Sequence, residues 1–247
     1  MGTNVKRYLV AAIALLMLSA GSTVGCKSGS SPKTDADTET EKANAETPDK
    51  SDETSAQEWF TKGNDHLDAG DWEKAIGAYQ SAVDKNAQRW DAYMNMGIAQ
   101  SSSGQFEEAV SSFEKSIAHG GKERPEVYYN LGNVYQKRGL YEQSIKAYRT
   151  SLSFADEPQV DTLVNIASAL TILGRKREAK ATYDKAQSLA PRDPRIQHGQ
   201  ALLLYHSRKF QESLDAFEQL HSMSPDYARA YYDKASVYVE MKNFKGA

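Results

Sequence analysis

The 247-residue chain has one cysteine, Cys26, so it can form no disulfide within itself and cannot supply a four-cysteine metal site. It also lacks an excess of basic residues. With 30 Lys and Arg against 33 Asp and Glu, its net charge of −3 argues against the basic face of a nucleic-acid-binding protein. No arrangement of nucleophile, base and acid stands out in the sequence. We therefore predict a protein that is not an enzyme and that uses no cofactor, metal or nucleic acid.

Long apolar runs are scarce, and the one at residues 8–20 lies close to the N-terminus. Its 13 residues are fewer than the roughly 20 that a membrane-spanning helix requires. Lys6 and Arg7 precede the run and small residues follow it. A charged start, a short apolar stretch and a small-residue cleavage site are typical of an export signal.

The segment that follows, "TVGC" at residues 23–26, resembles the end of a bacterial lipoprotein signal. In that family the cysteine becomes the acylated first residue, so the resemblance implies a signal peptide at residues 1–25 and lipidation of Cys26. Thr23 departs from the leucine usual at that place. Lys27 rather than aspartate follows the cysteine, which in enterobacterial members favours the outer membrane and a periplasm-facing protein of the cell envelope. The alternative is an ordinary cleaved signal or an uncleaved anchor.

The next segment, residues 27–56, contains no aromatic residue and no Ile, Leu, Val or Met. Four lysines and eight acidic residues give it a net charge of −4. Such a segment cannot bury enough apolar surface to offset the entropy lost on ordering. We therefore predict that residues 26–56 form a lipidated cysteine and a disordered acidic linker, which would span about 30 Å on average.

From residue 57 onward the chain repeats itself every 34 or 35 residues. A turn residue, a small residue five places later and an aromatic residue four places after that recur together, and a further small residue precedes each turn by seven places. The turn residues are Gly70, Gly104, Gly139, Gly174, Arg208 and Lys242. The aromatic residues are Tyr79, Phe113, Tyr148, Tyr183 and Phe217, and the preceding small residues are Gly63, Gly97, Gly132, Ala167 and Ala201.

This pattern resembles the tetratricopeptide (TPR) repeat, in which each unit is a pair of helices that buries its apolar face against the next pair. The resemblance implies an all-α fold, a right-handed α-solenoid of helix pairs over residues 57–247. The repeats are 56–89, 90–124, 125–159, 160–193, 194–227 and an incomplete one at 228–247. We interpret the incomplete repeat as part of a longer protein, or as an open end that a partner covers. The open repeat also makes self-association a hypothesis.

Asparagines recur at position 6 of the repeats, counted from each repeat's first residue, as Asn95, Asn130 and Asn165, and at position 9 as Asn64 and Asn133. In the family the first helices line a concave groove, which positions 5, 6 and 9 face. Apolar residues occupy most of position 5, among them Phe60, Met94, Tyr129 and Tyr232. Amides can bond the backbone of an extended peptide while apolar neighbours take its side chains.

The column is similar to the asparagine ladders of repeat arrays that clasp extended peptides, and we predict that these nine residues bind a peptide. The alternative is that each amide bonds within its own helical turn and faces water. A grip on a terminal carboxylate is not expected, because Phe60, Glu126 and Asn130 occupy the places where that site needs cations. His198 and His206 have no partner at ligand spacing, and "GGKE" at Gly120 and "RKRE" at Arg175 are interpreted as a turn and a solvated face.

Two functions fit these observations. The first is a membrane-tethered scaffold that binds an extended peptide or partner protein in its groove, similar to the repeat lipoproteins that help secretins or pilus components assemble. The second is the recruiting arm of a larger enzyme whose catalytic domain lies beyond residue 247. The position of the stop codon in the encoding DNA separates the two.

Overall fold

The computed structural model describes residues 50–245, and their side chains from residue 53 to residue 242. The predicted signal peptide, Cys26 and the linker up to residue 49 lie outside this range. Residues 50–245 hold eleven α-helices and one short 3-10 helix and no strand, which confirms the all-α prediction. The helices are α1 (Lys50–Ala69), α2 (Trp72–Lys85), α3 (Trp90–Ser102), α4 (Phe106–Ala118), η2 (Gly121–Glu123), α5 (Pro125–Lys137), α6 (Tyr141–Phe154), α7 (Val160–Ile172), α8 (Lys176–Leu189), α9 (Pro194–His206), α10 (Phe210–Met223) and α11 (Ala228–Lys245).

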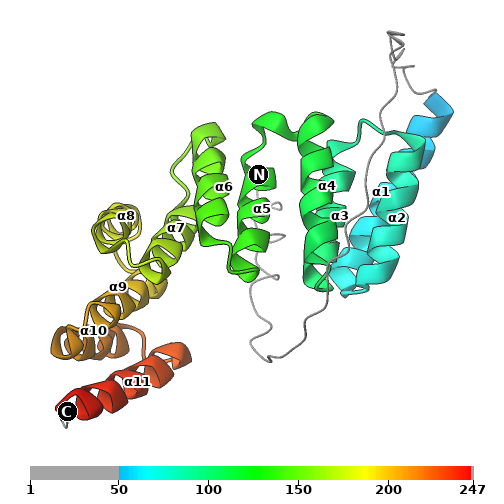
Figure 1. Ribbon diagram of the computed structural model, residues 1–247. Helices are drawn as coiled ribbons and strands as arrows, with labels where there is room; N and C mark the ends of the chain where they lie inside the picture. The colour runs from blue at the N-terminus through cyan, green and yellow to red at the C-terminus, as the bar shows by residue number, and fades with distance from the viewer. Residues whose placement is uncertain (1–49, 246–247) are drawn as a thin grey trace, which may run out of the picture. The chain divides into compact units, whose positions relative to one another are not determined.

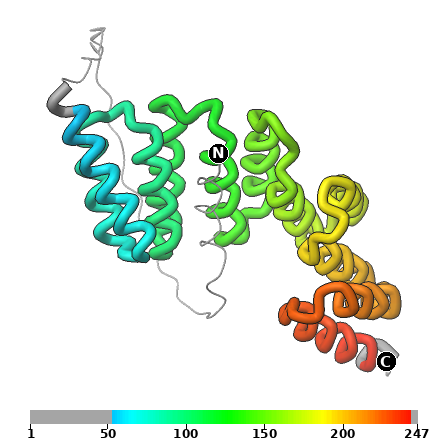
Figure 2. Tube along the Cα trace, turned by 180° about the vertical axis from the view of Figure 1, so that it is seen from behind, coloured from blue at the N-terminus to red at the C-terminus, as the bar shows by residue number. Residues whose placement is uncertain are grey.

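The helices pack as consecutive pairs, α1 with α2 through α9 with α10, and each pair also packs against the next. Figures 1 and 2 show the pairs following one another along the array, with α11 after the last pair. Each pair corresponds to one predicted repeat, so the predicted α-solenoid is confirmed. Within the described range, no helix is long and apolar enough to cross a membrane.

The turn inside each helix pair is formed by a residue in the left-handed conformation. Gly70, Gly104, Gly139 and Gly174 have φ between 73° and 85°, a region that is open to glycine at no steric cost. Arg208 occupies the equivalent place with φ 60° and is the one described residue other than glycine with positive φ. The turn column read from the sequence therefore marks the turn inside each of the five helix pairs.

The core is built where an aromatic residue of each second helix meets the small residue of its first helix. Tyr79, Phe113, Tyr148 and Phe217 are fully buried, and Tyr183 nearly so. A Cβ atom added to Gly132 would lie 2.6 Å from ring atoms of Tyr148, and one added to Gly63 would lie 2.5 Å from the Tyr79 ring. Glycine is therefore needed at these two crossings because the ring fills the space of a side chain.

The two ends of the array differ from the sequence-based expectation. Helix α1 begins at Lys50, seven residues before the predicted boundary, and Ala56 is fully buried. Acidic residues such as Glu53 are favourable in the first turns of a helix, which helps to explain the earlier start. Helix α11 runs through Lys242, where a turn was predicted.

Candidate ligand-binding face

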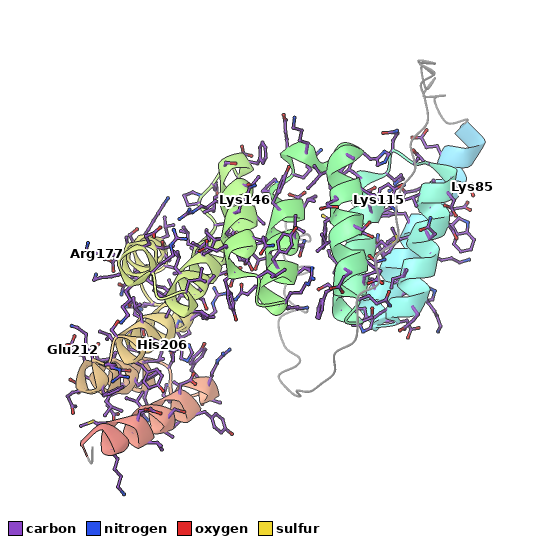
Figure 3. The ribbon with its side chains drawn as sticks, viewed as in Figure 1. Lys85, Lys115, Lys146, Arg177, His206 and Glu212 are labelled. Carbon is purple, nitrogen blue, oxygen red and sulfur yellow. The ribbon has the colours of Figure 1, made fainter. Side chains whose placement is uncertain are left out.

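The first helices of the repeats form the inner side of the array. Close backbone contacts join α1 to α3, α3 to α5, α7 to α9 and α9 to α11. Contacts as extensive as these do not join α5 to α7, which are linked by the hydrogen bond from Asn165 to Asn133, and they join no two successive second helices within residues 50–245. This asymmetry brings the first helices together and spreads the second helices apart. Positions 5, 6 and 9, which carry the predicted site, therefore lie on helices of the inner side. Figure 3 shows Arg177, by contrast, extending from α8 away from α7.

Two of the predicted site residues, Asn64 and Asn95, join the core residue Tyr79 in a contact that we call the first bridge. The Tyr79 hydroxyl donates to Asn64 Oδ1 at 2.8 Å, and Asn95 Nδ2 donates to the same oxygen at 2.9 Å. Tyr79 and Asn64 belong to repeat 1 and Asn95 to repeat 2. An amide oxygen accepts two hydrogen bonds, so both acceptor places of Asn64 Oδ1 are filled within the protein.

The same arrangement recurs between repeats 3 and 4 as the second bridge, formed by Tyr148, Asn133 and Asn165. The Tyr148 hydroxyl lies 2.6 Å from Asn133 Oδ1 and 2.8 Å from Gln136 Oε1. Asn165 Nδ2 donates to Asn133 Oδ1 at 3.4 Å and contacts the Tyr129 hydroxyl at 3.5 Å. Two amides of the predicted ladder thus connect repeats to each other.

The tyrosines of both bridges are protonated donors. Burial raises the pKa of Tyr79 and of Tyr148 well above the ordinary value, because the charged phenolate loses its hydration in the core. A buried hydroxyl must find an acceptor, and Asn64 and Asn133 supply one to each tyrosine. The position-9 asparagines therefore have a structural task, which the sequence-based prediction did not include.

Asn130 lies between the bridges and behaves differently. Its Nδ2 donates to Glu126 O of the same helix at 2.9 Å. In repeat 2, Phe113 replaces the bridge tyrosine and Ile98 replaces the position-9 asparagine, so the partner that Asn95 and Asn165 find is not available to Asn130. For this residue the bond within its own turn, the alternative weighed above, is the observed one. We call the contact of repeats 2 and 3 around Phe113, Ile98 and Asn130 the middle seam.

The apolar column divides into buried and accessible members. Met94 is 6% exposed and lies in a core cluster with Phe113, which corrects the prediction that it lines the groove. Phe60 is half-buried, with the Arg89 guanidinium 4.2 Å from its ring centre. Tyr129 is half-buried against Tyr148, and Tyr232 is 78% exposed. A position-5 side chain is buried where residues of the neighbouring repeat pack on it. The sequence of a single repeat does not contain this information.

The last two repeats contact each other through a histidine and a carboxylate. His198, at position 5 of repeat 5, is buried, and its Nε2 lies 2.7 Å from Asp233 Oδ2 at position 6 of repeat 6. The ring packs edge-on against Phe217 and Tyr227. This pair joins α9 to α11 as the bridges join earlier repeats. Among the described residues no group of three or more metal-ligating side chains comes together.

Two open depressions lie away from the predicted residues. One of about 490 Å³ runs along α6, lined by residues that include Lys146 and Arg149, and one of about 410 Å³ lies at residues 190–193. Near the first, Arg175 bonds Glu142 and Glu178 at the surface, in agreement with the solvated face predicted for "RKRE". "GGKE" is part of the turn around η2, as predicted.

Neither the recurring aromatic residue nor position 9 indicates the bridges when it is considered by itself. The signal is the coincidence of two columns: tyrosine occurs with a position-9 asparagine in repeats 1 and 3, whereas phenylalanine occurs with isoleucine in repeat 2. A tyrosine hydroxyl that enters the core predicts a nearby acceptor. Reading the columns in pairs would have located both bridges.

Comparisons with known proteins agree with this architecture. Three family models described as tetratricopeptide repeat match residues 60–121 and 198–247, 125–156, and 160–193, which together make up most of the chain. A search among curated proteins finds no match.

Similar solved structures have the same fold. A tetratricopeptide repeat protein from Parabacteroides merdae is 24% identical with a TM-score of 0.70, over 76% of this chain and 74% of that one. YrrB, described as a TPR protein with an unusual peptide-binding site, is 21% identical with a TM-score of 0.54, over 68% of this chain and 86% of its own. MamA is 18% identical with a TM-score of 0.62, over 71% and 94%. The repeat spacing, the helix pairs and the matching models lead to one conclusion: the chain belongs to the tetratricopeptide repeat family.

Proposed function

We propose that this protein is a binding scaffold that holds an extended peptide segment of a partner protein on the inner side of its array. One observation carries the proposal: α3, α5 and α7, the first helices of three successive repeats, each carry a half-buried asparagine at the same repeat position, Asn95, Asn130 and Asn165. Each amide has two N–H donors and an acceptor oxygen, so the bonds described above leave capacity for a ligand backbone. That YrrB is described as having a peptide-binding site supports the proposal by analogy.

The apolar contacts that remain available fit the same ligand. Tyr232 is exposed, and parts of Phe60 and Tyr129 are exposed beside the asparagines. Alternate side chains of an extended peptide point to opposite sides, so every second one can contact an aromatic ring while the backbone bonds the amides. A ligand with apolar side chains at alternate positions and little charge is therefore expected.

A random-peptide display library panned against the full chain in detergent tests the proposal. A benzophenone residue introduced at Ser102, on the inner helix α3, should crosslink the enriched peptides on irradiation. The matched control carries the same group at the exposed Ser111 of the outer helix α4 and should not. Equal crosslinking at both places, or a library without enriched peptides, would refute the proposed site.

We further propose that the scaffold is a lipoprotein of the bacterial cell envelope, anchored through Cys26, with the acidic segment 27–49 as its spacer. The support is the sequence of the N-terminus, with Lys6, Arg7 and the apolar run before "TVGC". Two or more acyl chains would hold it stably, at about 0.8 kcal/mol per buried methylene. A Cys26→Ser variant expressed in a bacterium should lose the acyl mass from its N-terminal peptide and leave the membrane fraction. A parent chain whose Cys26 peptide carries no acyl mass would overturn the anchor. A part in pilus or secretin assembly is the narrower form of this proposal.

A further inference from the structure

We propose that the ladder asparagines have two separate roles. Asn95 and Asn165 are positioning residues that fix repeat 2 to repeat 1 and repeat 4 to repeat 3, and Asn130 in the middle seam is the asparagine that bonds the ligand backbone. This inference rests on the proposed function and deepens it. Its starting point is that Asn95 and Asn165 bond a position-9 asparagine of the preceding repeat, whereas Asn130, which is equivalent in sequence, bonds the backbone of its own helix.

The bridge asparagines are committed to their neighbours. Asn95 Nδ2 and the buried Tyr79 hydroxyl share one acceptor oxygen, and Asn165 Nδ2 shares Asn133 Oδ1 with Tyr148 in the same way. A ligand that drew Asn95 away would loosen a contact that spans 31 residues of sequence and orients one repeat on the next. Binding through these amides would therefore disturb the surface that the ligand must fit.

Asn130 can turn to a ligand without that loss. Its Nδ2 bonds Glu126 O, which as a carbonyl in the first turn of α5 is also the acceptor for the backbone N–H four residues later. When the side chain rotates away, Glu126 O keeps its helical partner and no buried group is left unsatisfied. Asn130 is half-buried, as is Tyr129, which precedes it.

The middle seam itself is held differently from the bridged contacts. Phe113, Val127 and Leu131 join repeats 2 and 3 in one apolar cluster, and hydrophobic contact has no preferred direction. Polar contacts cross this seam at its two ends. At one end Lys137 Nζ lies 3.2 Å from Ser101 Oγ and Arg138 bonds Glu107 at 2.8 Å, and at the other the Tyr128 hydroxyl donates to Lys122 O at 2.9 Å. The centre of the seam can therefore adjust to a ligand while each bridged pair of repeats keeps its shape.

Single substitutions separate the two roles. The probe is the most enriched peptide from the display experiment, and binding and hydrogen exchange are measured on the full chain in detergent. Asn130→Ala should weaken binding at least about tenfold with unchanged exchange, equivalent to about 1.4 kcal/mol. Asn95→Ala and Asn165→Ala should speed exchange at their own repeat contacts. The inference is overturned if Asn130→Ala binds as the parent does, or if Asn95→Ala weakens binding as much with unchanged exchange.

A gain-of-bridge variant tests the same idea in the opposite direction. Ile98→Asn combined with Phe113→Tyr gives repeat 2 the residues of repeats 1 and 3, and Asn130 becomes the third member of a new bridge. Exchange at the middle seam should slow and the probe peptide should bind more weakly, because Asn130 is now held by the protein. Phe113→Tyr alone, which supplies no amide, is the matched control. Slower exchange with unchanged affinity would refute the assigned role of Asn130.

If the library yields no enriched peptide, the proposed function fails, and the ligand-binding role of Asn130 fails with it. The positioning role is then judged by exchange alone. Faster exchange in Asn95→Ala and Asn165→Ala, with none in Asn130→Ala, supports the bridges whatever the ligand proves to be. Equal exchange in all three variants would overturn them.

Discussion

Replacement of Gly132 by alanine tests the packing that holds each helix pair together. A Cβ atom at Gly132 would lie 2.6 Å from Cδ1 and Cε1 of Tyr148, whereas ordinary contacts begin near 3.4 Å. The Tyr148 ring would have to retreat by roughly 0.8 Å into a closely packed core. Its hydroxyl would move with it, away from Asn133 Oδ1 at 2.6 Å and Gln136 Oε1 at 2.8 Å.

The magnitude follows from three contributions. Overpacking of a core costs about 1–3 kcal/mol, and a disrupted bond of a buried hydroxyl costs about 1–3 kcal/mol. Alanine offsets about 1 kcal/mol of this because it favours a helix interior over glycine. We expect Gly132→Ala to lower the free energy of unfolding by about 1–5 kcal/mol, with a central value of about 3 kcal/mol.

Gly97→Ala is the matched control. Its Cβ atom would lie 3.0–3.1 Å from the ring of Phe113, which has no hydroxyl to displace. We expect a net loss below about 1 kcal/mol, because the helix propensity of alanine nearly offsets the milder contact. Urea unfolding compares the two variants, and hydrogen exchange locates the weakened repeat. If Gly132→Ala were as stable as Gly97→Ala, the close contact between Gly132 and the Tyr148 ring would not be what requires glycine at position 132.

Three further predictions follow from single residues. Burial raises the pKa of Tyr183 to about 12 from 10.0, so its contribution to stability is complete below pH 10 and is lost as the pH rises toward 12. Tyr183→Phe should therefore flatten the loss of stability measured by urea unfolding between these pH values, and an equally steep loss would refute the assignment. Arg208→Gly should stabilise repeat 5 by up to about 1 kcal/mol in the same assay, because the left-handed conformation at φ 60° disfavours a side chain. Asp233→Ala should leave the buried His198 without its carboxylate and speed hydrogen exchange in α11, whereas a rate equal to the parent's would show that the pair does not hold α11.

The fold could be predicted from the sequence because the same packing positions require the same kinds of residue in every repeat. The turn inside each helix pair uses a left-handed residue and the helix crossing needs a small one, so residues equivalent to Gly139 and Gly132 recur with the repeat. The ligand-binding face is harder to predict. Position 5 holds both Met94, which the neighbouring repeat buries, and Tyr232, which stays exposed, and no property of one repeat distinguishes them.

The residue at position 6 depends on what the preceding repeat presents to it. Where that repeat offers Tyr79 with Asn64, or Tyr148 with Asn133, position 6 is an asparagine that completes a bridge.

Repeat 4 offers Tyr183 without a position-9 asparagine. Position 6 of the next repeat, repeat 5, is Gly199. A Cβ atom at this place would lie 2.3 Å from the Tyr183 hydroxyl, so any side chain would collide with it. Repeats 2 and 5 offer Phe113 and Phe217, which present no polar group, and position 6 of the next repeat bonds elsewhere, as Asn130 and Asp233 do. Position 6 resembles a uniform ladder in sequence. The contacts of each position-6 residue nevertheless depend on the aromatic residue in the second helix of the preceding repeat. The asparagine that this residue leaves unbridged, Asn130, is the one to examine first for a ligand.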